Sequence, residues 1–320
     1  MIKRIFSFVF TAIIGSTAFS QDPEFTQFYA APLYLNPAFA GATVCPRMTL
    51  NYRNQWPNLS GTFVTYAASY DQYVRNLSGG IGFLLLTDRA GEGTISNTQL
   101  SGMYSYHVDI TRKLSFKAAL QATFVQKRVD WTKLRFGDQI DPRRGWIYET
   151  QEQQEQDMVL YPDFSAGMLL YSQNYYGGLA VNHLHEPDES FFNSTNKSPL
   201  PRKYTVHVGG VIPLDRKRVH ESTLSPNILF QMQEEFQQIN VGLYLSRGPM
   251  VGGLWYRNGD SFIALIGIQQ GMFKFGYSYD ATISKLGNPK DGTHGAHEFS
   301  IALQFKCRER KNKLIACPSF

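Results

Sequence analysis

Charged residues are scarce in this chain of 320 residues, at 18%, and no continuous apolar run after the first twenty residues reaches the roughly 20 residues that a membrane-spanning helix requires. The lack of long apolar runs excludes a helical membrane protein. It leaves a transmembrane β-barrel open, because only every second residue of a barrel strand faces lipid and the mean hydropathy stays modest. A composition with 18 Tyr, 23 Phe and 27 Gly fits such a barrel.

Signatures of nucleotide binding and of catalysis are also missing. The glycines of 79–82 lie in a strand pattern near a turn and do not form a phosphate-binding loop. His183, His185 and Glu186 could supply half of a metal site, but histidines in loops are mostly just exposed. A hydrolase would need a histidine that converges with a carboxylate or a nucleophile, and no such pair is defined here. We therefore expect no catalytic residue, no metal, no cofactor and no enzymatic activity.

Only three cysteines are present, Cys45, Cys307 and Cys317. Disulfides form in the compartments that exported proteins reach, and an odd count leaves at least one cysteine unpaired or paired with another chain. If the first and last strands are neighbours in a barrel, Cys45 lies just before one and Cys307 just after the other, within disulfide reach. We predict a bridge from Cys45 either to Cys307 or to Cys317.

The N-terminus has the features of a secretory signal peptide. Two basic residues at 3–4 precede an apolar run at 5–14, and a small-x-small cleavage site ends at Ser20. We expect cleavage after Ser20, so that 1–20 is a signal peptide, and the lack of a cysteine at that point excludes a lipoprotein. Loss of the two cations lowers the formal charge from +5 to about +3. Such a small excess, concentrated at 306–313, indicates a local contact and no nucleic-acid partner.

Polar and apolar residues alternate from residue 47 onward, most strictly in 114–124, 239–246, 273–280 and 299–306. Strict alternation indicates strands with one apolar and one wet face. The strands of a soluble β-sandwich alternate too, but they are usually about 5–6 residues long. The alternating segments here are nearer ten, the length that a tilted strand needs to cross a bilayer. We therefore predict an all-β fold, a transmembrane antiparallel up-and-down β-barrel.

We expect about fourteen strands in a single barrel domain at 47–307. An even number places both chain ends on the periplasmic side. The longest connections, 131–160, 185–201 and 282–295, then all face the cell exterior, whereas the periplasmic turns are short except for 214–225. The expected strand ranges are 47–55, 61–72, 78–88, 97–109, 113–130, 161–172, 175–184, 202–213, 226–234, 237–246, 249–258, 260–269, 271–281 and 296–306.

Two segments flank the predicted barrel. Residues 21–46 are too rich in aromatic side chains for a free tail, because such side chains favour burial. We predict that this segment acts as a plug, in the lumen or against the periplasmic mouth, with a loose periplasmic arm as the alternative. Residues 308–320 form a basic tail, for which we weigh a periplasmic partner against a solvated or membrane-surface tail.

Several stretches resemble the PorP/SprF family of the type IX secretion system. They include Asp22–Phe28, Leu33–Gly41, Tyr52–Pro57, Leu200–Tyr204 and Gly276–Asp280, followed near the end of the chain by Cys317-Pro318-Ser319-Phe320. The likeness covers the whole mature chain in the order of the family. No single stretch is specific, but together they are strong.

The resemblance implies an outer-membrane protein of gliding or protein-secreting bacteria. Its implied partners are outer-membrane lipid and either a secreted cargo adhesin or components of the type IX machine, namely a periplasmic ring and other outer-membrane subunits. We expect the protein to act by binding, with the outer loops and the tail as contact surfaces. The candidate contact residues are Trp131, Arg135, Phe136, Trp146, Phe191, Phe192, Arg308, Arg310, Lys311, Lys313 and Phe320.

Two other functions remain open from the sequence. A FadL-like channel for hydrophobic or small solutes also has about fourteen strands and an N-terminal plug, and a general porin shares the alternating pattern. A channel predicts solute uptake or conductance, whereas the family role predicts a bound protein partner. The mixed charges expected in the lumen favour ion pairs that brace a narrow barrel, because an anion-selective pore would show cations alone.

Overall fold

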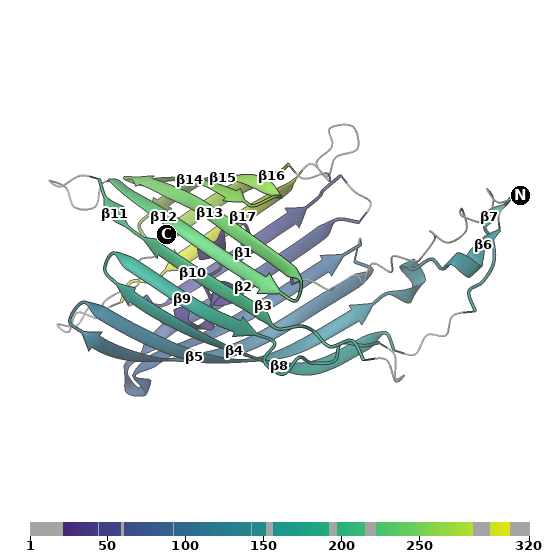
Figure 1. Cartoon of the computed structure of the whole chain (residues 1–320), viewed down its shortest axis with the longest axis horizontal. Coiled ribbons are helices and arrows are strands. Elements are labelled where there is room, and N and C mark those ends of the chain that lie inside the picture. Colours follow the sequence, from purple (N-terminus) through teal and green to yellow (C-terminus); the bar gives the residue numbers. More distant parts are fainter. Residues whose placement is uncertain are drawn as a thin grey trace, which may run out of the picture.

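The computed structural model describes residues 22–43, 45–58, 61–91, 93–141, 143–151, 156–191, 197–214, 222–283 and 295–307. In these residues, fourteen antiparallel strands close into a barrel (Figure 1), which confirms the predicted fold class. Each strand pairs with its neighbours in the sequence, and β1 pairs with β17 from Arg47 opposite Gln304 to Gln55 opposite Ala296. This last pairing closes the sheet.

The barrel strands have the following bounds: β1 Arg47–Gln55, β2 Phe63–Val74, β3 Gly79–Ala90, β4 Ile95–Thr111, β5 Leu114–Val129, β8 Met158–Ser172, β9 Tyr175–Asn182, β10 Lys203–Gly210, β12 Ser222–Gln233, β13 Phe236–Arg247, β14 Met250–Arg257, β15 Ser261–Gln270, β16 Phe273–Thr282 and β17 Ala296–Gln304. The two-residue strand β11 (Ile212–Pro213) pairs with the start of β12, and β6 (Ile140–Asp141) pairs with β7 (Gly145–Trp146) outside the barrel sheet.

The observed strands lie close to the predicted ranges. The first strand has the predicted bounds, and most other strands differ by one to three residues at either end. The largest difference is at β12, which begins at Ser222 although the sequence predicts a start at Pro226. Proline favours the first position of a strand because it cannot donate a ladder hydrogen bond. The residues before it still pair with β13, from Ser222 opposite Arg247 onward.

The barrel has two dissimilar ends. We call the end where β1 begins and β17 ends the terminal mouth, and the opposite end the far mouth. The connection from β5 to β8, residues 130–157, leaves the far mouth and is here called the arm. It extends well beyond the barrel (Figure 1). The turns at the terminal mouth that the structure describes are short, as in 112–113, 173–174 and 271–272.

Side chains alternate between a buried inner face and an exposed apolar outer face. In β5, for example, Leu120 and Phe124 are exposed on the outside, whereas Lys117 and Gln121 point inward and are buried. The outer face is therefore suited to lipid and the inner face to polar contacts. Among the described residues, no helix is long and apolar enough to cross a bilayer.

Candidate functional site: the occupied lumen and the arm

The lumen is occupied by the segment 22–46, here called the N-terminal segment, which runs from one mouth to the other. Asp22 contacts side chains at the far ends of β9, β10 and β12, whereas Cys45 lies at the terminal mouth beside the start of β1. The sequence predicts both chain ends on the periplasmic side. Among the described residues, Asp22 lies at the far mouth and Cys307 at the terminal mouth, because this segment traverses the lumen.

The N-terminal segment is built from three short helical turns, η1 (Phe28–Ala30), α1 (Pro32–Leu35) and η2 (Pro37–Phe39). Proline begins α1 and η2, where its missing N–H costs no hydrogen bond and its fixed φ suits a helix start. The side chain of Asn36 caps η2 by accepting a 2.9 Å hydrogen bond from the backbone N–H of Ala38. The sequence therefore encodes a compact shape for this segment.

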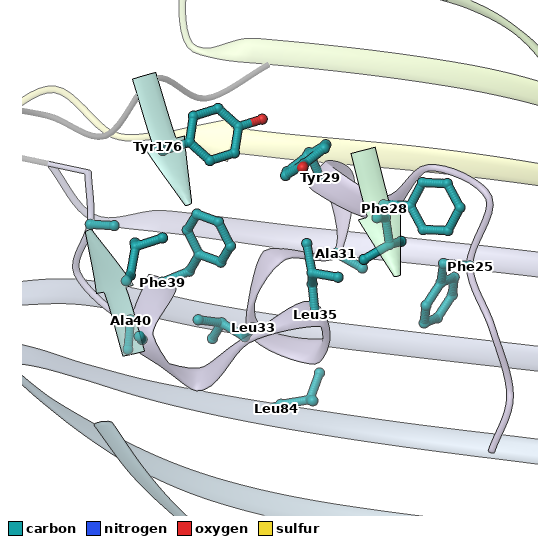
Figure 2. Packing of buried hydrophobic residues seen from close by; sticks show 14 of the residues in the cluster. Phe25, Phe28, Tyr29, Ala31, Leu33, Leu35, Phe39, Ala40, Leu84 and Tyr176 are labelled. Atoms are coloured by element: carbon teal, nitrogen blue, oxygen red, sulfur yellow. The ribbon is translucent and has the colours of Figure 1, made fainter. Parts of the chain in front are cut away.

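Apolar side chains of the N-terminal segment form the centre of the buried core (Figure 2). Phe28 packs on Trp255 of β14 with ring centroids 4.9 Å apart, and Tyr29 meets Tyr176 of β9 edge to face at 5.5 Å. Full burial of a large apolar side chain contributes about 1.5–3 kcal/mol. The six side chains that share this role are at most 7% exposed: Phe25, Phe28, Tyr29, Leu33, Leu35 and Phe39.

The first anchor of the N-terminal segment lies at the far mouth. His183 follows β9, and its Nε2 and Nδ1 atoms each lie 2.9 Å from a carboxylate oxygen, of Asp22 and Asp163 respectively. Lys203 Nζ lies 3.8 Å from the same Asp22 oxygen. Both ring nitrogens of His183 are thus engaged by carboxylates, and neither is open to a metal. The half-site weighed from the sequence, with His185 and Glu186, therefore has no free ligand at His183.

The oppositely charged side chains of the far-mouth anchor stabilise each other's ionised forms. Burial alone would lower the pKa of His183, but the charge of Asp22 and hydrogen bonds with Asp163 and Asp22 raise it to about 10. Burial alone would raise the pKa of the Asp22 carboxyl, but His183 and Lys203 hold it well below its ordinary value. His183 therefore stays protonated and Asp22 stays ionised across the neutral pH range.

We expect the far-mouth anchor to weaken as the pH rises from about 7 to about 10. A histidine with a raised pKa contributes stability that is complete below its ordinary pKa of roughly 6.5 and is lost as the pH rises through the docked value, here about 10. The rate of subtilisin cleavage within 22–30, measured by mass spectrometry, should therefore increase with pH. The increase should be larger than the pH-dependent increase in the activity of subtilisin itself. In the His183→Gln variant, cleavage should already be fast at pH 7 and follow the protease activity alone. An equal pH profile in both proteins would contradict the role of His183.

The second anchor lies deeper in the lumen, at Glu298 of β17. Its carboxylate accepts hydrogen bonds from the backbone N–H groups of Thr26 (2.5 Å) and Gln27 (3.1 Å) and from the Thr26 hydroxyl (2.8 Å). Arg53 of β1 lies 3.5 Å from the same carboxylate. Glu298 has no exposed surface, so all of these contacts are shielded from water.

Neighbouring charges extend this anchor toward the far mouth. Arg257 of β14 donates to Asp280 of β16 at 3.0 Å and lies 3.9 Å from Glu24 of the N-terminal segment. Arg53 lies 3.5 Å from the same Asp280 oxygen. Two arginines and three carboxylates, those of Glu24, Asp280 and Glu298, thus form one network between the segment and the wall.

The third anchor lies toward the terminal mouth. The carbonyl oxygen of Ala40 accepts hydrogen bonds from Ser105 (2.7 Å) and from Lys117, which has no exposed surface. The backbone N–H of Gly41 donates to Asp71 at 2.9 Å, and the other Asp71 oxygen accepts from Arg47 at 2.9 Å. The charges of this anchor are thus mixed in sign and paired with each other or with the backbone of the segment.

Asn36 binds the middle of the N-terminal segment to the part of the barrel wall formed by β8, β9 and β10. Its amide nitrogen lies 3.1 Å from the carbonyl oxygens of Met168 and Leu179 and from Nε2 of His207. The side chain is completely buried. It therefore uses its donors and its acceptor at once, which fixes the segment between β8, β9 and β10.

Glycines in the wall make room for the N-terminal segment. A Cβ on Gly80 of β3 would lie 2.1 Å from the carbonyl oxygen of Ala40 and 2.7 Å from Cα of Gly41. A Cβ on Gly167 of β8 would lie 2.2 Å from the Asn36 side chain. Gly41 itself has a positive φ of 59°, which favours glycine. The backbone of the N-terminal segment can approach the barrel wall closely only because these positions carry no side chain.

A disulfide ends the N-terminal segment. Cys45 and Cys307 are bonded, with their Cα atoms 5.4 Å apart, so the start of β1 is tied to the residues after β17. This is the first of the two pairings expected from the sequence. Cys317, the other candidate, lies outside the described residues.

The arm carries most of the described candidate contact residues. Near the barrel, Trp131 donates its indole N–H to the Gln156 carbonyl oxygen at 3.1 Å, and its ring stacks on Phe136 with centroids 6.3 Å apart. Toward the tip, the guanidinium of Arg135 lies over the ring of Trp146 at 5.4 Å. The structure therefore places these four residues along a single surface feature.

The tip of the arm is ordered by its own hydrogen bonds and exposes apolar side chains. Asp141 accepts from the backbone N–H groups of Arg143 and Arg144, both at 2.8 Å, and from the Tyr148 hydroxyl at 3.1 Å. The exposed apolar side chains of the tip are Ile140, Trp146, Ile147 and Tyr148, each at least 44% exposed. Side chains of this kind gathered on a projecting hairpin suit a protein contact.

One more candidate residue, Phe191, is described and lies outside the arm. Phe191 is half-buried in the connection between β9 and β10. Phe192, Arg308, Arg310, Lys311, Lys313 and Phe320 lie outside the described residues.

Sequence reasoning missed the polar residues that hold the N-terminal segment, above all Thr26 and Asn36, and weighed His183 only as part of a metal half-site. One signal was available for Asn36, because asparagine directly before proline is a favourable helix cap. Alternation in β8 also placed Asp163 on the inner face. Neither pattern could show which wall residues meet which residues of the segment, because those contacts join positions more than 100 residues apart.

A family model described as "Type IX secretion system membrane protein PorP/SprF" matches residues 17–303. No curated protein matches the sequence. Among solved structures, the toluene transporter TbuX of Ralstonia pickettii is similar with a TM-score of 0.49 and 9% identity, over 86% of this chain and 93% of that one. A Pseudomonas aeruginosa FadL homologue has a TM-score of 0.45 and 11% identity, over 85% and 93% of the two chains. For CdiB of Acinetobacter baumannii the TM-score is 0.42 and the identity 7%, over 81% and 60%.

Proposed function

Because the chain belongs to the PorP/SprF family of type IX secretion system membrane proteins, we propose that this barrel supports the secretion or the surface anchoring of a cargo protein by binding it in the outer membrane. The role requires no chemistry by the barrel itself. It does require a stable surface for the cargo and contacts with other components of the secretion machine.

The observation that carries this proposal is the occupied lumen. The N-terminal segment runs through the described interior from mouth to mouth, and it is held by three polar anchors and a disulfide. A barrel closed in this way is better suited to scaffolding than to passing solutes. The surfaces left for a partner are therefore on the outside, and the arm is the most prominent of them (Figure 1).

The asymmetry of the barrel supports an orientation with the far mouth at the cell exterior. Barrels of bacterial outer membranes have short periplasmic turns and longer external loops. The arm and the connection 183–202 both lie at the far mouth, whereas the described turns at the terminal mouth are short. In this orientation the arm meets the secreted cargo, and the terminal mouth meets periplasmic components of the machine.

Replacing both Trp146 and Tyr148 by alanine is expected to lower the recovery of cargo about tenfold or more, because removal of exposed aromatic anchors from an interface typically costs more than about 1.4 kcal/mol. The tagged full-length variant would be extracted from its own membrane with mild detergent, and bound proteins quantified by mass spectrometry.

A matched double variant provides the control for the arm. Tyr175 and Phe273 are exposed aromatic residues at the terminal mouth, 66% and 59% exposed, and their replacement by alanine should leave cargo recovery unchanged. If both double variants retain the cargo at the wild-type level, the arm is not the contact. If wild-type protein retains no secreted protein but conducts solutes in a planar bilayer, the binding role itself fails.

A further inference from the structure

A polar cavity lies on the outer wall of the barrel at the far mouth, outside the lumen. Its volume is about 610 Å³, and it lies between the β3–β4 turn and the start of the arm. Three cations line it, Arg89, Arg128 and Lys133, together with the carboxylates of Asp130 and Asp157. The hydroxyl groups around them belong to Thr87, Thr94, Ser96, Thr98 and Thr132.

The register of the strands places this cavity on the lipid-facing side. Arg89 of β3 pairs with Ser96 of β4, and Ser96 pairs with Arg128 of β5, so all three side chains share one face. The exposed apolar residues Leu85 and Phe124 lie on the same face, four positions before each arginine. Because paired residues of neighbouring strands point to the same side, the cations continue the outer face and do not enter the lumen.

The cavity sits at the height of a lipid headgroup. Four residues of strand cover about 13 Å along a tilted strand, so the arginines lie just beyond the apolar band. On the neighbouring strand β8, Leu160 and Met158 are exposed and apolar. Met158 pairs directly with Arg128, so the apolar surface extends alongside this arginine. The basic cavity therefore borders the apolar band both below and at one side.

The cations are exposed to an incoming anion. Arg128 lies 3.9 Å from Asp157, and Lys133 lies 3.9 Å from Asp130, and all four side chains are at least 41% exposed. Ion pairs between exposed side chains at this distance are weak. The guanidinium of Arg89 has no hydrogen bond or ion pair with the side chains or backbone of the residues that the structure describes. Guanidinium groups bind phosphate in a bidentate manner, which makes them suited to this ligand.

We propose that this cavity binds the phosphorylated sugar headgroup of a glycolipid in the leaflet that surrounds the far mouth. Arg89, Arg128 and Lys133 hold the phosphate, and the hydroxyl side chains hold the sugar. The acyl chains then lie along the apolar face of β3–β5 and β8. The choice of a glycolipid rests on the proposed orientation of the far mouth toward the cell exterior. The arm begins at this cavity, so a bound lipid would fix its base relative to the membrane.

The test uses purified full-length protein in detergent and native mass spectrometry, with phosphorylated lipid A as the probe. The variant Arg89→Gln/Arg128→Gln/Lys133→Gln should weaken the dissociation constant about tenfold or more, because charge-assisted hydrogen bonds to phosphate are the strong ones. The matched control is Arg75→Gln/Arg112→Gln/Lys113→Gln, which removes three exposed cations at the terminal mouth. This control should bind like the wild type. Heat-modified mobility in gels verifies that both variants fold.

Three outcomes would overturn the proposal. Equal weakening in both triple variants would mean a general effect of charge. Equal affinity of the wild type for dephosphorylated lipid A would remove the role of the phosphate. Equal affinity for phosphatidylglycerol would remove the preference for a glycolipid. The readout contains no cargo, so its failure would leave the proposed function untouched.

Discussion

Replacing Glu298 by alanine is expected to release the first part of the N-terminal segment from the lumen. The change removes the acceptor of the Thr26 and Gln27 N–H groups and takes one of the two carboxylate partners of Arg53, which keeps only Asp280. Removal of one partner from a buried pair typically costs roughly 3–5 kcal/mol. Hydrogen exchange of the Thr26 and Gln27 amides should therefore accelerate by a factor of at least about 100, since 1.4 kcal/mol corresponds to tenfold.

A conservative variant separates charge from shape at this position. Glu298→Gln keeps one oxygen acceptor and nearly the same volume, so its amides should exchange at rates between those of the wild type and of the alanine variant. Unchanged exchange in the alanine variant would show that Glu298 does not hold the segment. Exchange that rises equally at amides of distant strands would show general unfolding of the barrel.

Replacing Gly80 by alanine is expected to convert a closed barrel into a conducting one. The new Cβ would meet backbone atoms of Ala40 and Gly41 at 2.1–2.7 Å, and backbone cannot rotate away as the end of a flexible side chain can. Overpacking of this kind costs about 1–3 kcal/mol, which raises the undocked population of the segment by roughly 5-fold to 150-fold. Planar-bilayer recordings should show openings in the variant that are at least about fivefold more frequent than in the wild type.

The control for this experiment is Gly102→Ala. A Cβ on Gly102 of β4 would have no other atom within 4 Å, so the substitution should leave the bilayer record unchanged. Protease cleavage within 22–43 should increase in Gly80→Ala and stay at the wild-type level in Gly102→Ala. A Gly80→Ala barrel that folds and remains silent would show that the lumen stays closed without the wall glycine.

The strands could be predicted from the sequence because the alternation of polar and apolar residues involves only adjacent positions. In β5, each inward residue is followed by an outward one, so the strand and its faces follow from the alternation of neighbours. The ends of the strands follow less directly. The predicted start at Pro226 is four residues late, because β12 pairs with β13 from Ser222 onward and pairing depends on the partner strand as well as on the residue itself.

The contents of the lumen could be predicted only in outline. The aromatic residues of 21–46 indicated burial, because an apolar segment of this length is unfavourable in water. The path of the segment from the far mouth to the terminal mouth follows only from its contacts with the wall. Nothing local in Asp22 shows that its partner is His183, 161 positions away in the chain.

The sequence by itself therefore determined the strands, their lipid-facing and lumen-facing sides, the barrel class and the family to which the chain belongs. These features depend on the period of two in the side chains and on the resemblance of short motifs in order. The tertiary structure alone decided the path of the N-terminal segment, the Glu298 and His183 anchors, the glycines that admit Ala40, and the basic cavity at the far mouth. Each of these depends on strand register and barrel closure, which bring residues together across the whole chain.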